Sequence, residues 1–160
     1  FRITSGFGLG VGSSVINGAL DEIYANKYKH IDEYLCMRPF PQGITDATER
    51  QLRWKKYREE ILNENGVAIF IFGNKKDTED KKAISDGCLQ EFEIAKEKGR
   101  VIIPVGSTGD AAAIILANVK ADKDRYPYLE KYFGLLETET DIEKIVIAIL
   151  EIVKTQRTVL

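Results

Sequence analysis

Cysteine and histidine are scarce in this sequence. Its 160 residues include two cysteines, Cys36 and Cys88, and one histidine, His30. The cysteines stand far apart and lack the spacing of a metal-binding motif, so we expect no metal site. Few cysteines also fit a reducing cytoplasm, which is the localisation that we expect. No serine or cysteine nucleophile motif accompanies His30, and we interpret it as a residue of a polar loop.

Strong net charge and long hydrophobic runs are absent too. The formal net charge is −2 at pH 7, which gives no basic footprint for nucleic acid. No apolar stretch approaches the roughly 20 residues of a membrane-spanning helix, so we expect neither nucleic acid nor a membrane as a partner. A hydrophobic content of 44% and a charged content of 30% are typical of a globular protein. The length fits a single domain over residues 1–160.

Glycine is concentrated near the start of the chain, in the run Ser5-Gly6-Phe7-Gly8-Leu9-Gly10-Val11-Gly12. A short β-type run precedes it and a helical pattern follows, for which Ser13 or Ser14 can serve as the N-cap. A strand, a glycine turn and a helix N-terminus together favour the binding of a phosphate by backbone N–H groups. A turn that only lets the helix pack on the strand is the alternative. The dinucleotide pattern G-x-G-x-x-G is incomplete, because Ser13 occupies the place of its third glycine.

Strand and helix patterns alternate along the rest of the chain. Apolar runs predict strands at residues 34–37, 67–72 and 101–105, and Pro104 indicates that the last of these lies near an edge or has the proline near a strand end. Capping signals and apolar periodicity predict helices at residues 15–26, 46–65, 86–98, 111–116, 126–134 and 140–153. The charged residues 77–83 predict a mobile loop or lid. The fold class that we expect is α/β, a Rossmann-like open parallel sheet flanked by helices. Because the chain opens within a strand, we expect a fragment that lacks an N-terminal strand and helix.

Several charged residues follow the predicted strands. Ligands of open α/β sheets bind beyond the carboxyl ends of the strands. Arg38 follows the strand at 34–37 and either meets an anion there or is an ordinary surface arginine. Lys75 follows the strand at 67–72 and can reach the same crevice. Glu91, which we place in the first turn of the helix at 86–98, either accepts from ribose hydroxyls or complements the helix dipole.

Several ordered motifs resemble the SLOG superfamily, the relatives of the LOG phosphoribohydrolases. Arg58 precedes an apolar strand, Gly73-Asn74-Lys75 stands where the LOG enzymes have Pro-Gly-Gly, and Gly87-Cys88-Leu89-Gln90-Glu91 is similar to their Gly-Thr-x-x-Glu. Residues 5–10, 38–42, 72–75 and 91–95 resemble the C-terminal SLOG domain of sirtuin-type Thoeris anti-phage effectors, and the resemblance covers nearly the whole chain.

This resemblance implies a sensor that has no catalytic residues and no cofactor of its own. The ligand would be a cyclic ADP-ribose isomer, a second messenger made by a partner TIR-domain enzyme. A sirtuin-like domain of the same chain would then hydrolyse NAD, and the protein would be a homo-oligomer. Phe7 or Phe40 would stack on the base. The predicted ligand-binding residues are Gly6, Phe7, Gly8, Leu9, Gly10, Arg38, Arg58, Gly73, Asn74, Lys75 and Glu91.

Two other functions remain open at this point. One is a LOG-like hydrolase of nucleoside monophosphates that uses Glu91 and Arg58. The loss of Pro-Gly-Gly and the insertion of residues 76–86 argue against it. The other is a plain dinucleotide-binding module, in which Arg38 would suit a 2′-phosphate. The missing third glycine argues against this second alternative.

Overall fold

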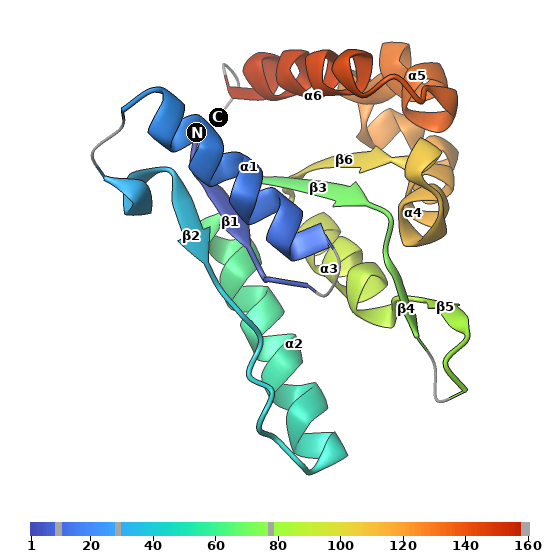
Figure 1. Ribbon diagram of the computed structural model, residues 1–160. Helices are drawn as coiled ribbons and strands as arrows, with labels where there is room; N and C mark the ends of the chain where they lie inside the picture. Colours follow the sequence, from blue (N-terminus) through green and yellow to red (C-terminus); the bar gives the residue numbers. More distant parts are fainter. Residues whose placement is uncertain (9–10, 28–29, 77–78, 158–160) are drawn as a thin grey trace. The chain divides into compact units, whose positions relative to one another are not determined.

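The computed structural model describes residues 1–8, 11–27, 30–76 and 79–157 (Figure 1). The chain divides into two compact units, Phe1–Asn65 and Gly66–Leu160. We describe each unit by itself. Both contain parallel strands with helices that follow them in the chain, so the predicted α/β class is confirmed.

The first unit is built on two short parallel strands. β1 (Ile3–Ser5) pairs with β2 (Leu35–Met37), with Ile3 opposite Leu35. Helix α1 (Val11–Ala25) buries Ile16, Ala19 and Ile23 in a core that includes Leu35. A single 3-10 turn, η1 (Ile31–Glu33), precedes β2, and His30 before it is exposed, as expected of a loop residue.

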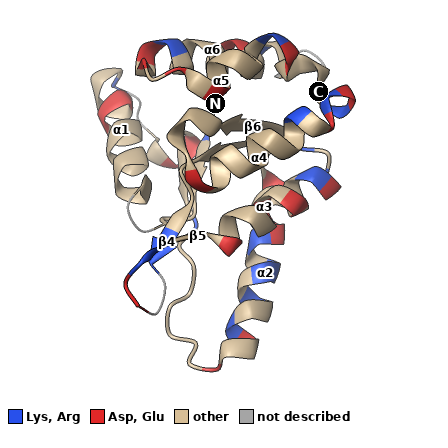
Figure 2. Ribbon diagram, turned by 90° about the vertical axis from the view of Figure 1, so that its right-hand side faces the viewer, with Lys and Arg blue, Asp and Glu red and all other residues tan. Residues whose placement is uncertain are grey.

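Helix α2 (Ala47–Glu64) completes the first unit. Its N-cap is Asp46, whose Oδ1 accepts from the Glu49 N–H at 2.7 Å, as the capping signal predicts. Lysines and arginines recur along α2 (Figure 2). A basic helix that buries only Leu62 is held by the contacts of its few larger side chains, which are described below.

The predicted cap of the first helix is wrong. Helix α1 already begins at Val11, so Ser13 and Ser14 lie inside its first turn. The glycine run enters the helix directly, because the Gly12 N–H donates to the Gly8 carbonyl at 3.0 Å. A serine hydroxyl within the first turn cannot occupy the position that precedes the helix.

The second unit contains the larger core. β3 (Val67–Ile71) pairs in parallel with β6 (Val101–Val105), and Phe70 lies opposite Pro104. Six large aliphatic side chains are fully buried there: Ile102, Ile103, Ile115, Leu129, Leu136 and Ile152. The helical elements are α3 (Asp86–Glu97), η2 (Gly106–Thr108), α4 (Asp110–Ala121), η3 (Lys123–Arg125), η4 (Pro127–Tyr132), α5 (Phe133–Thr138) and α6 (Ile142–Arg157).

Strand β6 has a blocked outer edge, in agreement with the interpretation of Pro104. Among the described strands of this unit, β6 pairs only with β3. The Tyr128 hydroxyl accepts from the Ile102 N–H at 2.9 Å and donates to the Ile102 carbonyl at 3.1 Å. Successive residues of a strand direct their N–H and C=O groups to opposite edges, so Pro104 faces the same outer edge as Ile102 and has no N–H to offer there. No further strand can add at these positions.

The segment after β3 is not a loop throughout, which corrects the prediction for residues 77–83. β4 (Asn74–Lys76) and β5 (Lys82–Ile84) form an antiparallel hairpin, with Lys75 opposite Ala83. The sequence did not predict these strands because they carry charged residues and lack alternating apolar side chains. Their pairing depends on backbone hydrogen bonds. Residues 77 and 78 lie outside the described part of the chain.

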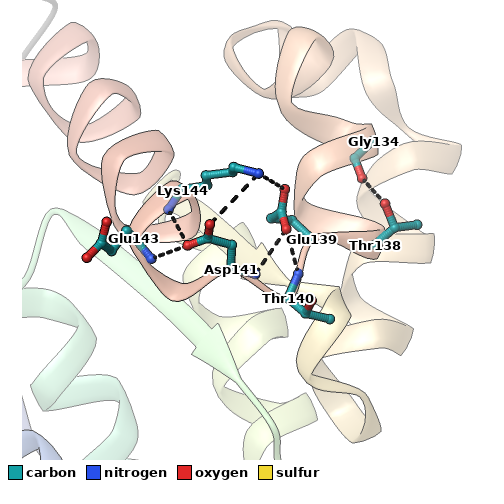
Figure 3. A network of polar contacts seen from close by, with 7 residues as sticks. All are labelled: Gly134, Thr138, Glu139, Thr140, Asp141, Glu143 and Lys144. Carbon is teal, nitrogen blue, oxygen red and sulfur yellow. Dashed lines mark hydrogen bonds and ion pairs between the residues drawn. The ribbon is translucent and has the colours of Figure 1, made fainter.

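Residues Thr140-Asp141-Ile142-Glu143 have the sequence pattern of a capping box, and the start of α6 differs from it in one detail. Asp141, and not Thr140, supplies the cap, because its Oδ1 accepts from the Glu143 N–H at 3.0 Å and the Lys144 N–H at 3.4 Å (Figure 3). The Glu139 carboxylate accepts from the N–H groups of Thr140 and Asp141, and these bonds lower its pKa. A carboxylate is favoured there by the positive end of the helix dipole. Among the described helices, none is long and apolar enough to span a membrane.

Candidate functional site

The glycine turn of the first unit places Gly6, Phe7 and Gly8 directly after β1. Phe7 has a left-handed backbone with φ of 53°, and its N–H donates to Ser5 Oγ at 3.2 Å. A Cβ on Gly12 would lie 2.8 Å from the Phe7 carbonyl carbon, so the turn requires glycine at position 12. Leu9 and Gly10, also predicted to bind the ligand, lie outside the described residues.

The loop after β2 lies against this turn. The Arg38 N–H donates to the Ser5 carbonyl at 2.8 Å. A Cβ on Gly6 would come within 3.0 Å of the Phe40 ring, so the Gly6 backbone lies against that ring. The Arg58 guanidinium carbon lies 5.0 Å from the centre of the same ring, which is a cation–π contact. The first unit therefore brings Gly6 and Arg58 together at the Phe40 ring, and the Arg38 backbone lies against the same turn.

Phe40 is itself fixed by aromatic contacts with α2. Its ring meets those of Tyr57 and Trp54 edge to face, with centroids 5.2 and 5.9 Å apart. The Trp54 indole N–H donates to the Pro41 carbonyl at 3.0 Å. These contacts hold the loop on the helix and give Arg58 a defined position, since a guanidinium stacks well on aromatic faces.

Arg38 is paired with a carboxylate of its own unit. Its guanidinium forms an ion pair with Glu64 near the end of α2. The hydrogen bond and charge of Glu64 raise the pKa of Arg38 above its ordinary value. An anion that binds Arg38 must therefore compete with Glu64.

The second unit holds Gly73 and Asn74 where two helices begin. Gly73 has φ of 94°, and a Cβ there would lie 2.6 Å from the Ala111 Cβ, so only glycine fits. Asn74 Nδ2 donates to Asp110 Oδ2 at 2.8 Å. Lys82 from β5 lies 2.8 Å from the other oxygen of Asp110, and both bonds lower the pKa of that carboxyl.

Lys75 forms an ion pair with Asp86, the first residue of α3. The hydrogen bond from Lys75 lowers the pKa of Asp86. The hairpin is thus attached to the start of α3 through Lys75 and to the start of α4 through Asn74 and Lys82.

Glu91 does not lie in the first turn of its helix, contrary to the prediction. Helix α3 begins at Asp86, with Ser85 as its N-cap, so Glu91 falls in the second turn, where it is half-buried. It follows Cys88 by three residues, which puts both on one face of α3. The Cys88 sulfur would be 3.1 Å from a Cβ on Gly73, so this face is the one near Gly73.

The sequence did not identify the carboxylates that bind three of the predicted ligand residues. Glu64, Asp86 and Asp110 each bind a predicted ligand residue. Asp110 follows η2 and Gly109 and has a left-handed φ of 55°, which is uncommon outside glycine. The only sequence signal was that Asp86 and Asp110 stand at helix starts, where an acidic residue has an ordinary role with the dipole.

Comparison with known proteins identifies the class of the chain. Residues 1–156 match the Sir2- and TIR-associating SLOG family, and the chain belongs to this family. A protein named NAD(+) hydrolase ThsA from Acinetobacter baumannii is 42% identical over 151 residues, covering 88% of this chain and 31% of the relative. A protein of the same name from Bacillus cereus is 39% identical over 160 residues, covering 96% of this chain and 33% of the relative. The chain spans about a third of the length of these relatives.

Proposed function

We propose that this chain is a regulatory domain that binds a cyclic ADP-ribose isomer and thereby activates an attached NAD-hydrolysing, sirtuin-like domain in anti-phage defence. The family and the names of the relatives support the attached activity. NAD would be the substrate of the attached domain, and this domain would need no cofactor. The messenger would come from a partner TIR-domain enzyme, and the proteins would act in the cytoplasm.

The observation that carries the proposal is the group around Phe40 in the first unit. The Gly6 backbone and the Arg58 guanidinium both lie at the Phe40 ring, and the backbone of Arg38, directly after β2, is bonded to Ser5 at the end of β1. Backbone N–H groups of a glycine turn before α1 suit a phosphate, and a guanidinium adds charge-assisted hydrogen bonds. A pyrophosphate-containing ligand offers the anion that such a group selects.

The second unit supports the proposal with Lys75 and Asn74. Both side chains are held by carboxylates at the carboxyl end of β3. A ligand phosphate can replace a carboxylate there without leaving a cation unpaired. Glu91 would accept from ribose hydroxyls, which are the natural donors for a carboxylate in nucleotide sites.

Calorimetry with the cyclic nucleotide tests the assignment. Replacing Arg58 or Lys75 by Ala should each cost about 1.5–3 kcal/mol of binding free energy, the value of a charged hydrogen bond. This corresponds to a roughly 10- to 150-fold weaker Kd. Lys55→Ala, on an exposed position of the same basic helix, is the control and should change affinity little. Equal affinity in both variants and the wild type would refute the assignment. The same samples, assayed for free base from AMP, test the LOG-like alternative.

Ligand binding would act through the β4–β5 hairpin. Lys75 and Lys82 hold the hairpin to Asp86 and Asp110. A ligand that binds Lys75 would break the ion pair between Lys75 and Asp86. The loss of this attachment would favour a second arrangement of the hairpin. Such a shift requires that the ligand bind one arrangement better than the other.

Helix α6 offers a surface for the homo-oligomer. Ile142, Val146 and Leu150 are exposed and recur every four residues, so they form one apolar stripe. In an antiparallel pair of α6 helices, Glu143 of each copy would lie opposite Lys154 of the other, on the flank of the stripe. A parallel pair would not bring these opposite charges together. The charge pattern therefore favours a second copy in antiparallel orientation.

Light scattering of the chain tests this surface. Leu150→Glu should abolish the dimer, whereas Thr155→Glu, on the polar side of α6, should leave it intact. A monomer in the wild type at all concentrations, with and without ligand, would refute pairing through α6. A dimer that Leu150→Glu leaves unchanged would refute the surface.

A further inference from the structure

An exposed phenylalanine follows the central strand of the second unit. Phe72 comes directly after β3, at the carboxyl end of the β3–β6 pair, and the residue is 44% exposed. The strand was predicted to include it, but the backbone leaves the strand at this residue. Burying such a ring would stabilise the fold by about 1.5–3 kcal/mol. The fold leaves this gain unused at the end of the sheet where ligands of α/β proteins bind.

The backbone of Phe72 is strained and firmly held. Its φ is 54°, which is an outlier for a bulky residue. The Phe72 N–H donates to Thr108 Oγ1 at 2.7 Å, and the Thr108 hydroxyl donates to the Val105 carbonyl at 2.7 Å. The Phe72 carbonyl accepts from the Ala112 N–H at 2.9 Å. These bonds and the tightly packed Gly73 fix the conformation, and such strain persists only where the surroundings enforce it.

The fold itself does not need a ring at this position. Glycine or asparagine would take the left-handed conformation at lower cost, and an exposed ring contributes little to the core. Phe7 in the first unit repeats the combination, since it follows β1 closely, has φ of 53° and is 48% exposed. Each unit therefore holds one exposed phenylalanine in a strained conformation at the end of a parallel strand.

We propose that Phe72 is the aromatic platform on which the purine base of the ligand stacks, an inference that rests on the proposed function. A base has a flat π-face that stacks on an aromatic ring, whereas a phosphate or a sugar has none. Asn74 follows Phe72 by two residues in the chain, and Asp110 is the first residue of α4. A hydrogen bond joins their side chains. They provide polar groups for the edge of a base that lies on the ring.

Binding of base-containing and base-free ligands separates stacking from a structural role. Phe72→Leu should weaken binding of the cyclic ADP-ribose isomer roughly 5- to 150-fold, the range seen when a stacking ring is truncated. Phe72→Trp should retain affinity. Ribose 5-phosphate, which has no base, should bind wild type and Phe72→Leu equally. Phe72→Asn should raise the midpoint of chemical unfolding, because strain is relieved, and yet lose affinity.

Phe70→Leu is the matched control. Phe70 is buried against Phe92, so its replacement should lower stability and leave ligand selectivity unchanged. If the wild type binds the nucleotide and Phe72→Leu binds it equally well, the platform is refuted and the proposed function stands. If Phe72→Leu weakens the binding of both ligands equally, the role of Phe72 is structural and the platform is again refuted. If the wild type binds no adenine nucleotide, both proposals fail.

Discussion

Removing the Asp86 carboxylate should strengthen ligand binding. Asp86 forms an ion pair with Lys75, which we propose as a phosphate ligand. In the absence of ligand this pair must be broken before Lys75 can meet a phosphate. The substitution Asp86→Asn keeps the shape of the side chain and removes its charge, so Lys75 no longer has a competing anion there.

The exposure of the pair sets the size of the effect. The side chains of Lys75 and Asp86 are 47% and 70% exposed, so solvent screens their attraction strongly. Such pairs contribute about 0.2–1 kcal/mol. Asp86→Asn should therefore lower the Kd by about 1.4- to 5-fold. The gain should shrink at high ionic strength, as for any exposed pair.

Calorimetry of wild type and Asp86→Asn measures this gain. Asp80→Asn is the control, because it removes the same charge from a pair with Lys76 in the same hairpin. Acid provides a second readout. The folded pKa of Asp86 is depressed, so the pair is intact above the ordinary carboxyl pKa and is lost as pH falls through the folded value. Wild-type affinity should then approach that of Asp86→Asn. Weaker binding by Asp86→Asn would refute competition.

Two further predictions concern stability. Burial raises the pKa of Tyr128 to about 12 in the folded protein. The stability that this shift contributes is complete below the unfolded-state pKa of about 10 and is lost as pH rises through about 12. Tyr128→Phe should remove this alkaline loss in denaturant titrations and, by leaving the Ile102 backbone groups unpaired, should cost about 1–3 kcal/mol at neutral pH. If the free energy of unfolding of Tyr128→Phe falls with alkaline pH as steeply as that of the wild type, this prediction is contradicted. Gly73→Ala should cost about 2–4 kcal/mol from backbone strain and overpacking. Gly43→Ala, which meets open space, should cost little, and equal costs would count against the packing at Gly73.

Much of the fold follows from local patterns in the sequence. The apolar runs at β3 and β6 and the Asp46 cap of α2 are properties of neighbouring residues, so they are predictable. Pro104 also indicates an edge or a strand end for β6, because proline cannot donate in a ladder. The β4–β5 hairpin does not follow, since its strands carry charged residues and lack alternation.

The contacts of the candidate site are less predictable than its residue types. Glycine turns and cations at strand ends point to an anion from sequence alone. The partner of each cation depends on residues far along the chain, as in the pair of Arg38 with Glu64 and the stacking of Arg58 on Phe40. The conformation of Phe72 is likewise held by tertiary contacts with Thr108 and Ala112, which no local pattern signals.

Calorimetric titration of a cyclic ADP-ribose isomer into the wild type, Arg58→Ala and Lys75→Ala tests the central claim most directly. We expect saturable binding by the wild type, an affinity reduced roughly 10- to 150-fold in each variant, and no release of free base. Absence of binding by the folded wild type, or binding that neither variant weakens, would contradict the assignment of this chain as a sensor of a phosphorylated nucleotide.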